Sequence, residues 1–598
     1  MCRIAGIIDK SASPKQLEKN VEAMCTSMQH GGPDGWGQVK EPNFGLCFGH
    51  RRLALLDLSA SGKQPMRYGD NLLITFNGEI YNHLELRNQL SALGYQFSTQ
   101  TDTEVILAAY KNWGIRSFSK IEGMFAFALL DKEKEMSYLV RDQNAIKPLY
   151  YSTENQRLVF SSEVKAFSKT SYLYKENEDW KTYFLAFGHI PAPYTTLKNI
   201  FSLKPGHFLE WNHQYGMFHI LSFEQGNPIH TPAKKAMVST VLADKLNRSV
   251  KQQMVADAKV GVFLSGGIDS SIITLIANRF STKNLAMVSI NFTEPAYSEG
   301  KFQRLIAENI NGTHHSHKVE ATDFNKDFQN ILSAMDQPTS DGINSWFVNK
   351  FARIDGLKAV LSGIGADEYF GGYPSFNRMK TIKYLKKLPR YLLKLTAKFP
   401  SEKLKRIHYL SYKNPIGEYL FLRGFFIPET IAAILKINKN EIDSLFENFP
   451  IDKSINILNG KERAAWLETN IFMQNQLLKD TDFMSMVHGI EVRVPFLDKG
   501  LLNYISNLSA EQRFRKKPKG ILINAFKAIL PESIWKRPKM GFSFPLNDWF
   551  LKGGQITDEK IYAENDCAIK EIRRFKSGKS HWSKAFALYQ VAIANSQH

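Results

Sequence analysis

Two domains of different fold class are predicted for this 598-residue chain: α+β over residues 1–215 and α/β over residues 236–598. A chain of this length exceeds what one hydrophobic core supports. Residues 1–215 contain short apolar stretches separated by Gly, Pro, Asn and Asp. From residue 236 strand and helix patterns alternate, which is typical of a doubly wound parallel sheet with helices on both faces. After residue 376 the pattern is mostly helical.

The individual elements follow from hydrophobic periodicity. Three leucines recur at helical spacing and predict a helix over residues 84–93. Gly and Pro interrupt the pattern between the domains, so residues 216–235 are expected to form a linker. Strands are predicted at 72–76 and 124–130 in the first domain, and at 260–264, 285–292 and 357–361 in the second.

The composition is that of an ordinary soluble globular protein. Hydrophobic residues make up 43% of the chain and charged residues 23%. No apolar run approaches the roughly 20 residues that span a bilayer, and an acidic residue at position nine argues against a signal peptide. The four cysteines show no C-x-x-C and no metal-ligand spacing, so a disulfide scaffold is not expected. This cysteine usage predicts a reducing cytoplasm.

The formal net charge is +19, and two stretches carry much of the excess. Residues 378–406 contain many Lys and Arg, a single acid, and interleaved Tyr and Leu, while residues 513–539 form a second basic run. No nucleic-acid-binding motif accompanies either stretch, so no nucleic-acid partner is expected. A solvated amphipathic helical face is the preferred interpretation, and weak association with an acidic surface such as a membrane is the alternative.

Cys2 is the first candidate catalytic residue. Removal of the initiator methionine would leave Cys2 with a free α-amino group, whose ordinary pKa of about 8 lets it act as a general base for the adjacent thiol. A cysteine at position two is weak evidence by itself, but a set of distinctive segments follows it. These segments are Cys-Arg-Ile-Ala-Gly-Ile at 2–7, His-Gly-Gly-Pro-Asp-Gly at 30–35, His-Arg-Arg-Leu-Ala at 50–54, Phe-Asn-Gly-Glu-Ile-Tyr-Asn at 76–82, Thr-Asp-Thr-Glu at 101–104 and Glu-Gly-Met-Phe-Ala at 122–126.

This ordered set resembles the glutaminase domain of class II glutamine amidotransferases and covers nearly all of residues 1–215. The resemblance implies an N-terminal-nucleophile fold (αββα), two stacked sheets between helices. It also implies that Cys2 attacks the side-chain amide of glutamine and releases ammonia. One departure is Gly31, because the family usually has Arg at this position.

Further roles at this site come from the resemblance. It implies that the side chain of Asn77 and the backbone N–H of Gly78 stabilise the oxyanion of the tetrahedral intermediate. It implies that Arg52 binds the α-carboxylate of glutamine, a task that suits a two-pronged guanidinium. Glu79 and Asp102 match the positions that bind the α-ammonium group. The alternative for Asn77-Gly78 is an ordinary hairpin turn.

A glycine-rich turn follows the predicted strand at 260–264 and precedes an apolar helix. Backbone N–H groups of such a turn, at a helix N-terminus, can hold an anion. The turn lacks the G-K-[ST] of a Walker A loop, so it is not expected to hold a nucleotide for γ-phosphoryl transfer. It resembles the pyrophosphate loop of ATP pyrophosphatases, which adenylate a carboxylate or carbonyl and release pyrophosphate. The resemblance implies that ATP contacts Leu264, Ser265, Gly266, Gly267, Asp269 and Ser270.

A second segment, starting at Ser362-Gly363, follows the predicted strand at 357–361. Ligands bind outside the carboxyl ends of parallel strands, so a partner carboxylate for Asp269 is expected there. The segment resembles the second ATP motif of glutamine-hydrolysing asparagine synthetases. That resemblance implies that Asp269 and Asp367 hold Mg²⁺, that Ser362 and Gly363 line the pocket, and that Lys519 neutralises the leaving pyrophosphate. Further matches at 480–485, 491–498 and 536–542 extend it over most of the chain.

The resemblance implies that the two sites catalyse the two halves of one reaction. It also implies that the reaction requires ATP and Mg²⁺ and that all of its substrates are small molecules. Glutamine is hydrolysed at Cys2, ammonia travels inside the protein, ATP adenylates a carboxylate, and ammonia displaces AMP. Aspartate is the preferred acceptor. Ile364 stands where an acid is usual and Ser298 where Asp is common, so another carboxylate, such as a sugar acid of surface-polysaccharide synthesis, is the alternative. A non-catalytic nucleic-acid binder is disfavoured because the central residues of both sites are present. A homodimer is left open.

Overall fold

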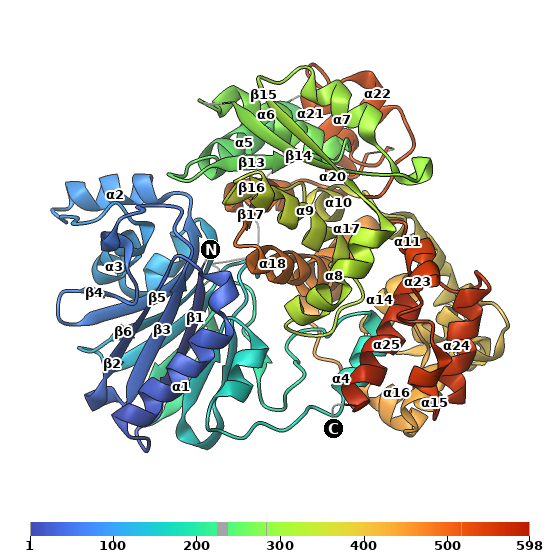
Figure 1. Cartoon of the computed structure of the whole chain (residues 1–598), viewed down its shortest axis with the longest axis horizontal. Coiled ribbons are helices and arrows are strands. Elements are labelled where there is room, and N and C mark those ends of the chain that lie inside the picture. The colour runs from blue at the N-terminus through green and yellow to red at the C-terminus, as the bar shows by residue number, and fades with distance from the viewer. Residues whose placement is uncertain (1, 224–236, 283, 516, 597–598) are drawn as a thin grey trace.

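The computed structural model describes residues 2–223, 237–282, 284–515 and 517–596. The first region contains two six-stranded antiparallel sheets, ordered β10-β8-β9-β1-β3-β2 and β12-β11-β7-β6-β5-β4 (Figure 1). Its strands are β1 (Arg3–Ile8), β2 (Gly35–Glu41), β3 (Leu46–Arg52), β4 (Met66–Tyr68), β5 (Leu72–Ile80), β6 (Gly123–Asp131), β7 (Met136–Arg141), β8 (Tyr150–Ser152), β9 (Leu158–Ser161), β10 (Phe201–Ser202), β11 (His207–Asn212) and β12 (Met217–Ser222). Its helices are α1 (Pro14–Ser27), α2 (His83–Ala92), α3 (Asp102–Trp113) and α4 (Trp180–Phe187).

Strand alternation explains the layering of this region. Successive side chains of a strand point to opposite faces. In β5, Leu73 packs between the two sheets, whereas Ile74 and Phe76 pack beneath α2 and α3. In β1, Ile4 enters the inter-sheet core, whereas Ala5 packs against α1. The result is the predicted αββα order, with α1 outside one sheet and α2 and α3 outside the other.

The second region contains a five-stranded parallel sheet ordered β15-β14-β13-β16-β17. In β14, Leu285 and Met287 face the core under α5 and α6, whereas Ala286 and Val288 face the opposite core beside α9. Helices therefore cover both faces, as predicted. The strands are β13 (Val260–Phe263), β14 (Leu285–Phe292), β15 (Gly312–Val319), β16 (Ala359–Leu361) and β17 (Glu491–Arg493). The helices are α5 (Val238–Gln253), α6 (Ile268–Phe280), α7 (Gly300–Ala307), α8 (Ala321–Ala334), α9 (Ile343–Ile354), α10 (Ala366–Phe370), α18 (Leu478–Val487), α19 (Lys499–Ser506), α20 (Ala510–Arg513), α21 (Gly520–Phe526) and α22 (Glu532–Trp535).

The remaining helices form a helical layer that shares an apolar core with β14, β15, α8 and α9 (Figure 1). They are α11 (Ser375–Leu385), α12 (Arg390–Leu395), α13 (Glu402–Lys405), α14 (Ile416–Arg423), α15 (Pro428–Leu435), α16 (Lys439–Glu447), α17 (Gly460–Leu467), a π-helix (Glu468–Leu477), α23 (Leu546–Gly553), α24 (Asp566–Lys576) and α25 (Trp582–Ser596). Helix α4 lies among them, because Tyr183, Phe184 and Phe187 join their apolar core (Figure 1). The predicted first domain of residues 1–215 therefore sends α4 into the helical layer before the chain returns to β10.

The predicted helix at 84–93 corresponds to α2, and the predicted strands correspond to β5, β6, β13, β14 and β16. The linker expected over residues 216–235 starts too early, because Met217–Ser222 forms β12 and pairs with β11. Residues 224–236 of that expected linker lie outside the described part of the chain. Strand β15 was not predicted, because an edge strand with little buried surface lacks an apolar pattern. No helix among the described residues has the length and apolarity needed to cross a bilayer.

Candidate active sites

Cys2 lies directly before β1, where the strand enters the inter-sheet core, and its side chain is only 9% exposed. Its backbone N–H donates to Oδ1 of Asn77 over 3.1 Å, and its Sγ lies 3.9 Å from the carbonyl oxygen of Leu53. Burial raises the pKa of the Cys2 thiol above its ordinary value, although the Arg52 guanidinium opposes this rise. The thiol therefore needs a nearby base to become a thiolate at neutral pH.

Asn77 and Gly78 lie within β5, opposite β6, so the hairpin-turn alternative is wrong. The Nδ2 of Asn77 is buried and finds no hydrogen-bond partner among the described residues. A buried donor without a partner is costly, and an oxyanion beside Cys2 would satisfy it. Gly78 has φ of 154°, and a Cβ there would lie 2.1 Å from the carbonyl oxygen of Met124. Only glycine fits this position.

Arg52 ends β3 and is oriented by the loop that follows. Its Nη1 donates to the carbonyl oxygen of Ser59 over 2.8 Å, and its Nη2 donates to the carbonyl oxygen of Asp57. A Cβ on Gly62 would lie 2.0 Å from Nη2, so the glycine makes room for the guanidinium. Arg52 makes no ion pair within the described residues, which leaves its charge available for a substrate carboxylate.

Glu79 and Asp102 are both buried beside this site. Asp102 begins α3 and accepts the backbone N–H of Ile80 over 3.0 Å. Oε1 of Glu79 lies 3.5 Å from Nη2 of Arg493, which comes from β17 of the second region. Burial and the neighbouring Glu491 carboxylate raise the pKa of Glu79 well above its ordinary value.

Arg493 connects the two candidate sites, a role that was not predicted. Its guanidinium is fully buried, contacts Glu79, and donates to Glu491 over 2.6 Å. Its backbone carbonyl oxygen accepts the N–H of Ser362 over 2.8 Å. Residues 491–498 match the family in sequence, but no local pattern in them reveals a contact with Glu79.

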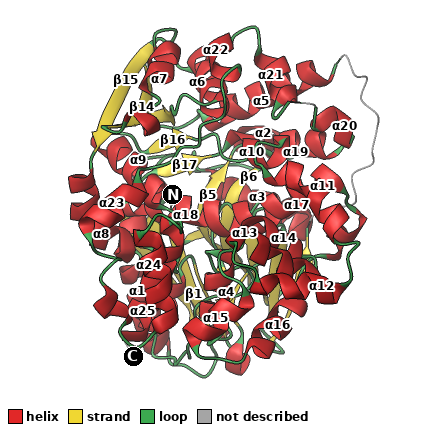
Figure 2. Ribbon diagram, turned by 90° about the vertical axis from the view of Figure 1, so that its right-hand side faces the viewer, coloured by secondary structure: helices red, strands yellow, loops and turns green. Residues whose placement is uncertain are grey.

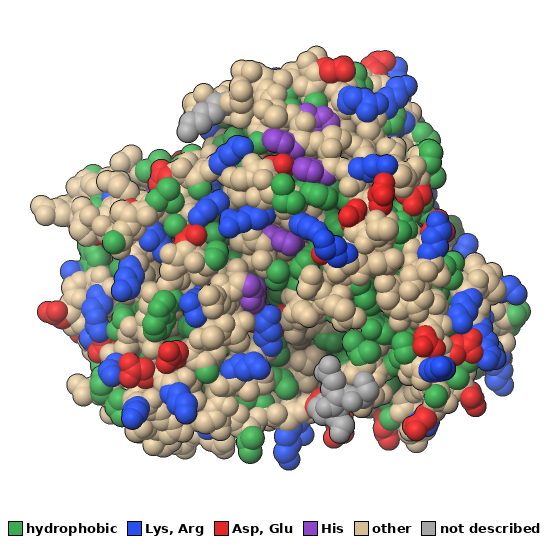
Figure 3. All heavy atoms as spheres, viewed as in Figure 1, with side chains coloured by type: hydrophobic (Ala, Val, Ile, Leu, Met, Phe, Trp, Pro, Cys, Tyr) green, Lys and Arg blue, Asp and Glu red, His purple; other side chains and the backbone are tan. Residues whose placement is uncertain are grey.

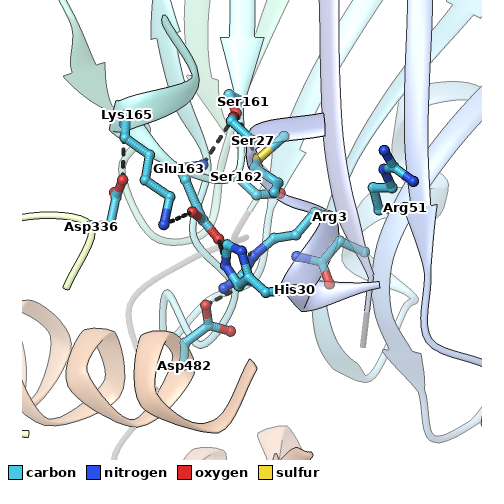
Figure 4. A network of polar contacts seen from close by, with 12 residues as sticks. Arg3, Ser27, His30, Arg51, Ser161, Ser162, Glu163, Lys165, Asp336 and Asp482 are labelled. Atoms are coloured by element: carbon cyan, nitrogen blue, oxygen red, sulfur yellow. Dashed lines mark hydrogen bonds and ion pairs between the residues drawn. The ribbon is translucent and has the colours of Figure 1, made fainter. Parts of the chain in front are cut away.

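Arg3 forms a second contact between the two regions (Figure 4). Its fully buried guanidinium lies between Glu163, at 2.7 Å, and Asp482 of α18, at 2.8 Å. His30 and Lys165 also contact Glu163, each over 2.9 Å. Despite burial, the Arg3 charge holds the pKa of Glu163 below its usual range.

The Arg3 network also leaves no room for a side chain at Gly31. A Cβ on Gly31 would lie 2.7 Å from Cγ of Arg3 and 3.0 Å from its Nε. The stem of Arg3 therefore occupies the space that a side chain at position 31 would need.

The glycine-rich turn joins β13 to α6 at the carboxyl edge of the parallel sheet. Gly266 has φ of +83°, a conformation that favours glycine. The hydroxyls of Ser265 and Ser270 lie 2.9 Å apart, and the N–H of Gly267 donates to Oγ of Ser265 over 3.3 Å. A Cβ on Gly363 would lie 2.9 Å from Cβ of Asp269, so the two predicted ATP motifs are in direct contact.

Asp269 and Asp367 lie on either side of Lys519, as the sequence predicted for residues of one site. The Nζ of Lys519 lies 2.5 Å from Oδ2 of Asp269 and also contacts Oδ1 of Asp367. Lys539 approaches the same oxygen of Asp367 at 2.8 Å. A Cβ on Gly372 would overlap Asp367, at 1.6 Å, so this glycine is required for the arrangement. Lys519 itself has φ of +55°, an uncommon conformation for a residue with a side chain.

The two carboxylates suit Mg²⁺, which takes one or two carboxylates together with phosphate oxygens and water. Oδ1 of Asp269 is buried without a hydrogen-bond partner among the described residues, so it has free lone pairs. No group of three or more metal-binding side chains occurs within the described residues. Such a group is not needed when ATP supplies the other ligands.

Two basic residues near the glycine-rich turn were not predicted individually. Arg537 donates to the carbonyl oxygen of Gly266 over 2.9 Å and also contacts Glu299. Lys539 contacts Asp367, as described above. Both residues lie in the basic run at 513–539 and in the family match at 536–542. The family match was the one sequence signal that could have identified them. Ile364 packs at the edge of an apolar core with Leu497 and Val492.

A buried cysteine at the start of an αββα domain and paired carboxylates at the edge of a parallel sheet define a class: amidotransferases joined to an ATP-dependent synthetase. The comparisons with known proteins make the assignment specific. A model of the asparagine synthase family matches residues 241–575, and a glutamine amidotransferase domain model matches residues 1–219. The chain belongs to the asparagine synthase family.

Similar proteins span nearly the whole chain. This chain is 30% identical over 565 residues to asparagine synthetase [glutamine-hydrolyzing] 1 of Bacillus subtilis (strain 168), and the match covers 92% of this chain and 88% of that protein. It is 29% identical over 601 residues to asparagine synthetase [glutamine-hydrolyzing] 3 of the same organism, covering 96% and 92%. It is also 26% identical over 631 residues to amidase chry2 of Gibberella zeae, covering 92% and 90%.

Proposed function

We propose that this chain converts aspartate to asparagine, with glutamine as the nitrogen donor and ATP cleaved to AMP and pyrophosphate. The observation that supports the proposal is that one chain contains both candidate sites. One places a buried thiol beside an unpartnered amide donor, and the other places two carboxylates and two lysines beside a glycine-rich turn. The two similar proteins from Bacillus subtilis carry this activity in their names.

The first half of the reaction takes place at Cys2. The α-amine of the mature chain accepts the thiol proton, and Sγ attacks the amide carbon of glutamine. Nδ2 of Asn77 and the N–H of Gly78 donate to the oxyanion that forms. The α-ammonium group of Cys2 returns this proton to the amide nitrogen as the C–N bond breaks and ammonia leaves, and water then hydrolyses the thioester to glutamate. Arg52 holds the α-carboxylate of the substrate during both steps. Because this chemistry needs a free thiol, we infer a reducing cytoplasm as the setting.

In the second half, an oxygen of the acceptor carboxylate attacks the α-phosphorus of ATP, and the bond to pyrophosphate breaks. Lys519 and Lys539 exchange their carboxylate partners for phosphate oxygens and neutralise the developing charge. Mg²⁺ held by Asp269 and Asp367 supplies further charge neutralisation when it is bound. Ammonia then attacks the acyl carbon, AMP leaves, and one proton is lost.

Ammonia needs a path on which it stays unprotonated. An apolar core joins Met124 and Ile146 of the first region to Val492 and Val494 of the second, and Ile364 packs against it. Apolar surroundings disfavour ammonium relative to neutral ammonia. We propose that ammonia travels along this core from Cys2 toward the acceptor site.

A second candidate acceptor is a carboxylate other than aspartate, such as a sugar acid. The observation in its favour is Ile364, whose packing in the apolar core leaves no acid at that position to contact an amine of the acceptor. The similarity to amidase chry2 is compatible with a different acceptor in this family.

The test is an assay of purified protein with ATP, Mg²⁺ and glutamine, offering aspartate or a hexuronic acid in separate reactions. AMP and the amide product are measured together. With aspartate, the proposal expects asparagine and AMP in equal amounts. With the sugar acid, it expects neither AMP nor an amide. Amidation of the sugar acid without asparagine formation would replace the preferred acceptor by the alternative.

A further inference from the structure

Large apolar side chains are exposed at unusual density along one outer segment. Between residues 384 and 404, helices α11, α12 and α13 and their connections expose seven of them, and Tyr384 and Tyr391 are 69% and 65% exposed. The described chain has one other such group, Tyr215, Met217, Phe218 and Leu221 around β12, and elsewhere these side chains are mostly isolated along the sequence. The seven are Tyr384, Leu388, Tyr391, Leu392, Leu395, Phe399 and Leu404.

These side chains are additional to the face that the segment buries. Phe376, Met379 and Ile382 of α11 and Leu393 of α12 pack into the core of the helical layer. A solvated amphipathic helix would bury its apolar residues and expose only polar ones. The segment instead exposes several apolar side chains in addition to those it buries, and Figure 2 shows α11 and α12 along one edge of the molecule. A solvated face therefore does not account for it.

The same segment carries a strong positive charge. Between residues 378 and 406 the only acid is Glu402. Lys386, Arg390 and Lys405 form ion pairs with acids, but most of the other basic side chains have no carboxylate partner in the described part of the chain. On the face shown in Figure 3, by contrast, basic side chains lie among acidic ones. The exposed basic side chains without such a partner are Arg378, Lys380, Lys383, Lys387, Lys394, Lys398 and Lys403.

We propose that residues 378–406 form a docking surface for an anionic lipid bilayer. Lysines whose stems lie along apolar surface keep their charges at the headgroup level, while tyrosine and leucine enter the boundary with the acyl chains. The Nζ of Lys387 lies 5.8 Å from the ring centre of Tyr384, so the two kinds of side chain are interleaved. Each basic residue near an anionic leaflet strengthens binding about fivefold.

Charge and composition separate this occupant from the others. A second copy of the chain would bring an equal positive charge to the contact and be repelled. A nucleic acid would use the lysines but leave leucines such as Leu388 and Leu395 exposed to water. An anionic surface with an apolar interior satisfies both halves of the segment.

The test is sedimentation of the full-length protein with vesicles of phosphatidylcholine alone or with 30% phosphatidylglycerol. The proposal expects at least tenfold tighter binding to the anionic vesicles, most of it lost in 0.5 M salt. A charge variant (Lys380→Glu, Lys383→Glu, Lys387→Glu) and an apolar variant (Tyr384→Ser, Tyr391→Ser, Leu395→Ser) should each weaken binding at least tenfold. An unchanged far-UV circular dichroism spectrum and an unchanged thermal unfolding midpoint show that each variant is folded.

Matched controls change exposed residues elsewhere. Lys15→Glu with Lys19→Glu, and Leu173→Ser with Ile457→Ser, should leave vesicle binding within twofold, since these side chains lie outside the surface. Absence of binding to anionic vesicles, or equal losses in the control variants, would overturn the proposal. Tighter binding to duplex DNA than to vesicles, or a dimer that the apolar variant disrupts, would also overturn it in favour of another occupant.

Discussion

The two candidate sites are held together by different physical means. Around Cys2, the elements are strands of two facing sheets: Cys2 precedes β1 of one sheet, and Asn77 lies in β5 of the other. At the nucleotide site, Asp269 and Lys519 lie 250 residues apart in the chain and are joined by an ion pair at 2.5 Å. Strand geometry shapes the first site, and opposite charges shape the second.

The two sites also differ in whether their binding groups already have partners before the substrate binds. Nδ2 of Asn77 is buried without a partner, so an oxyanion gains a donor that needs no rearrangement. Lys519 already contacts two carboxylates, so phosphate must replace existing partners. We therefore expect the glutaminase site to depend on geometry and the nucleotide site on the balance of charge.

The largest expected effect is the loss of glutamine-dependent synthesis in a variant that leaves the nucleotide site intact. Cys2→Ala removes the nucleophile, so glutamine-dependent amide synthesis should fall about 10³-fold or more. Synthesis from added ammonia should stay within about twofold, because the nucleotide site is untouched. Both rates are measured as AMP release, and Cys567→Ala, a half-buried cysteine elsewhere, is the matched control. Continued use of glutamine by Cys2→Ala would reject Cys2 as the nucleophile.

Lys519→Met tests the nucleotide site and should leave the glutaminase site intact. Loss of a cation that stabilises a transition state costs about 10²–10³-fold in rate, so glutamine- and ammonia-dependent synthesis should fall together. Glutaminase activity should change by less than about twofold. Lys527→Met, an exposed lysine at the end of the same helix, should have no effect on either rate. A loss of glutaminase activity in Lys519→Met would show that the sites are not separate in this way.

The pH dependence of Cys2 reactivity tests the buried state of the thiol. Its pKa is raised by burial, so below that pKa the thiolate fraction grows about tenfold per pH unit. Alkylation by iodoacetamide without glutamine should accelerate accordingly from pH 7 to 9. Peptide mapping distinguishes Cys2 from Cys25 and Cys47, whose pKa values burial raises to about 12. A rate already constant at pH 7 would mean a lowered pKa and contradict the account.

The smallest effect concerns the contact between the regions. Arg3→Met leaves Glu163 and Asp482 buried without their shared cation, which should cost about 3–5 kcal/mol of unfolding free energy. If Arg3 also aligns the two halves, glutamine hydrolysed per amide formed should rise about threefold. Arg3→Lys keeps the positive charge but loses the two-pronged guanidinium. It should therefore restore the unfolding free energy more than the ratio of glutamine hydrolysed to amide formed. Unchanged stoichiometry in Arg3→Met would limit the network to a structural role.

Sequence reasoning worked where the information is local. The apolar stretch at 72–76 predicted β5, and the leucines at helical spacing predicted α2. It did not reveal β15, an exposed edge strand, or the passage of α4 into the helical layer. The contacts of Arg493 with Glu79 and of Lys539 with Asp367 join segments far apart in sequence. No periodicity or spacing encodes such pairs.

The central claim is that one chain activates a carboxylate by adenylation and then supplies it with ammonia from glutamine. Aspartate labelled with ¹⁸O in its side-chain carboxylate tests this most directly, by mass spectrometry of the nucleotide product. Adenylation transfers one labelled oxygen to phosphorus, so the account predicts AMP carrying one ¹⁸O for each asparagine formed. ADP as the product, with the label in inorganic phosphate, would contradict it.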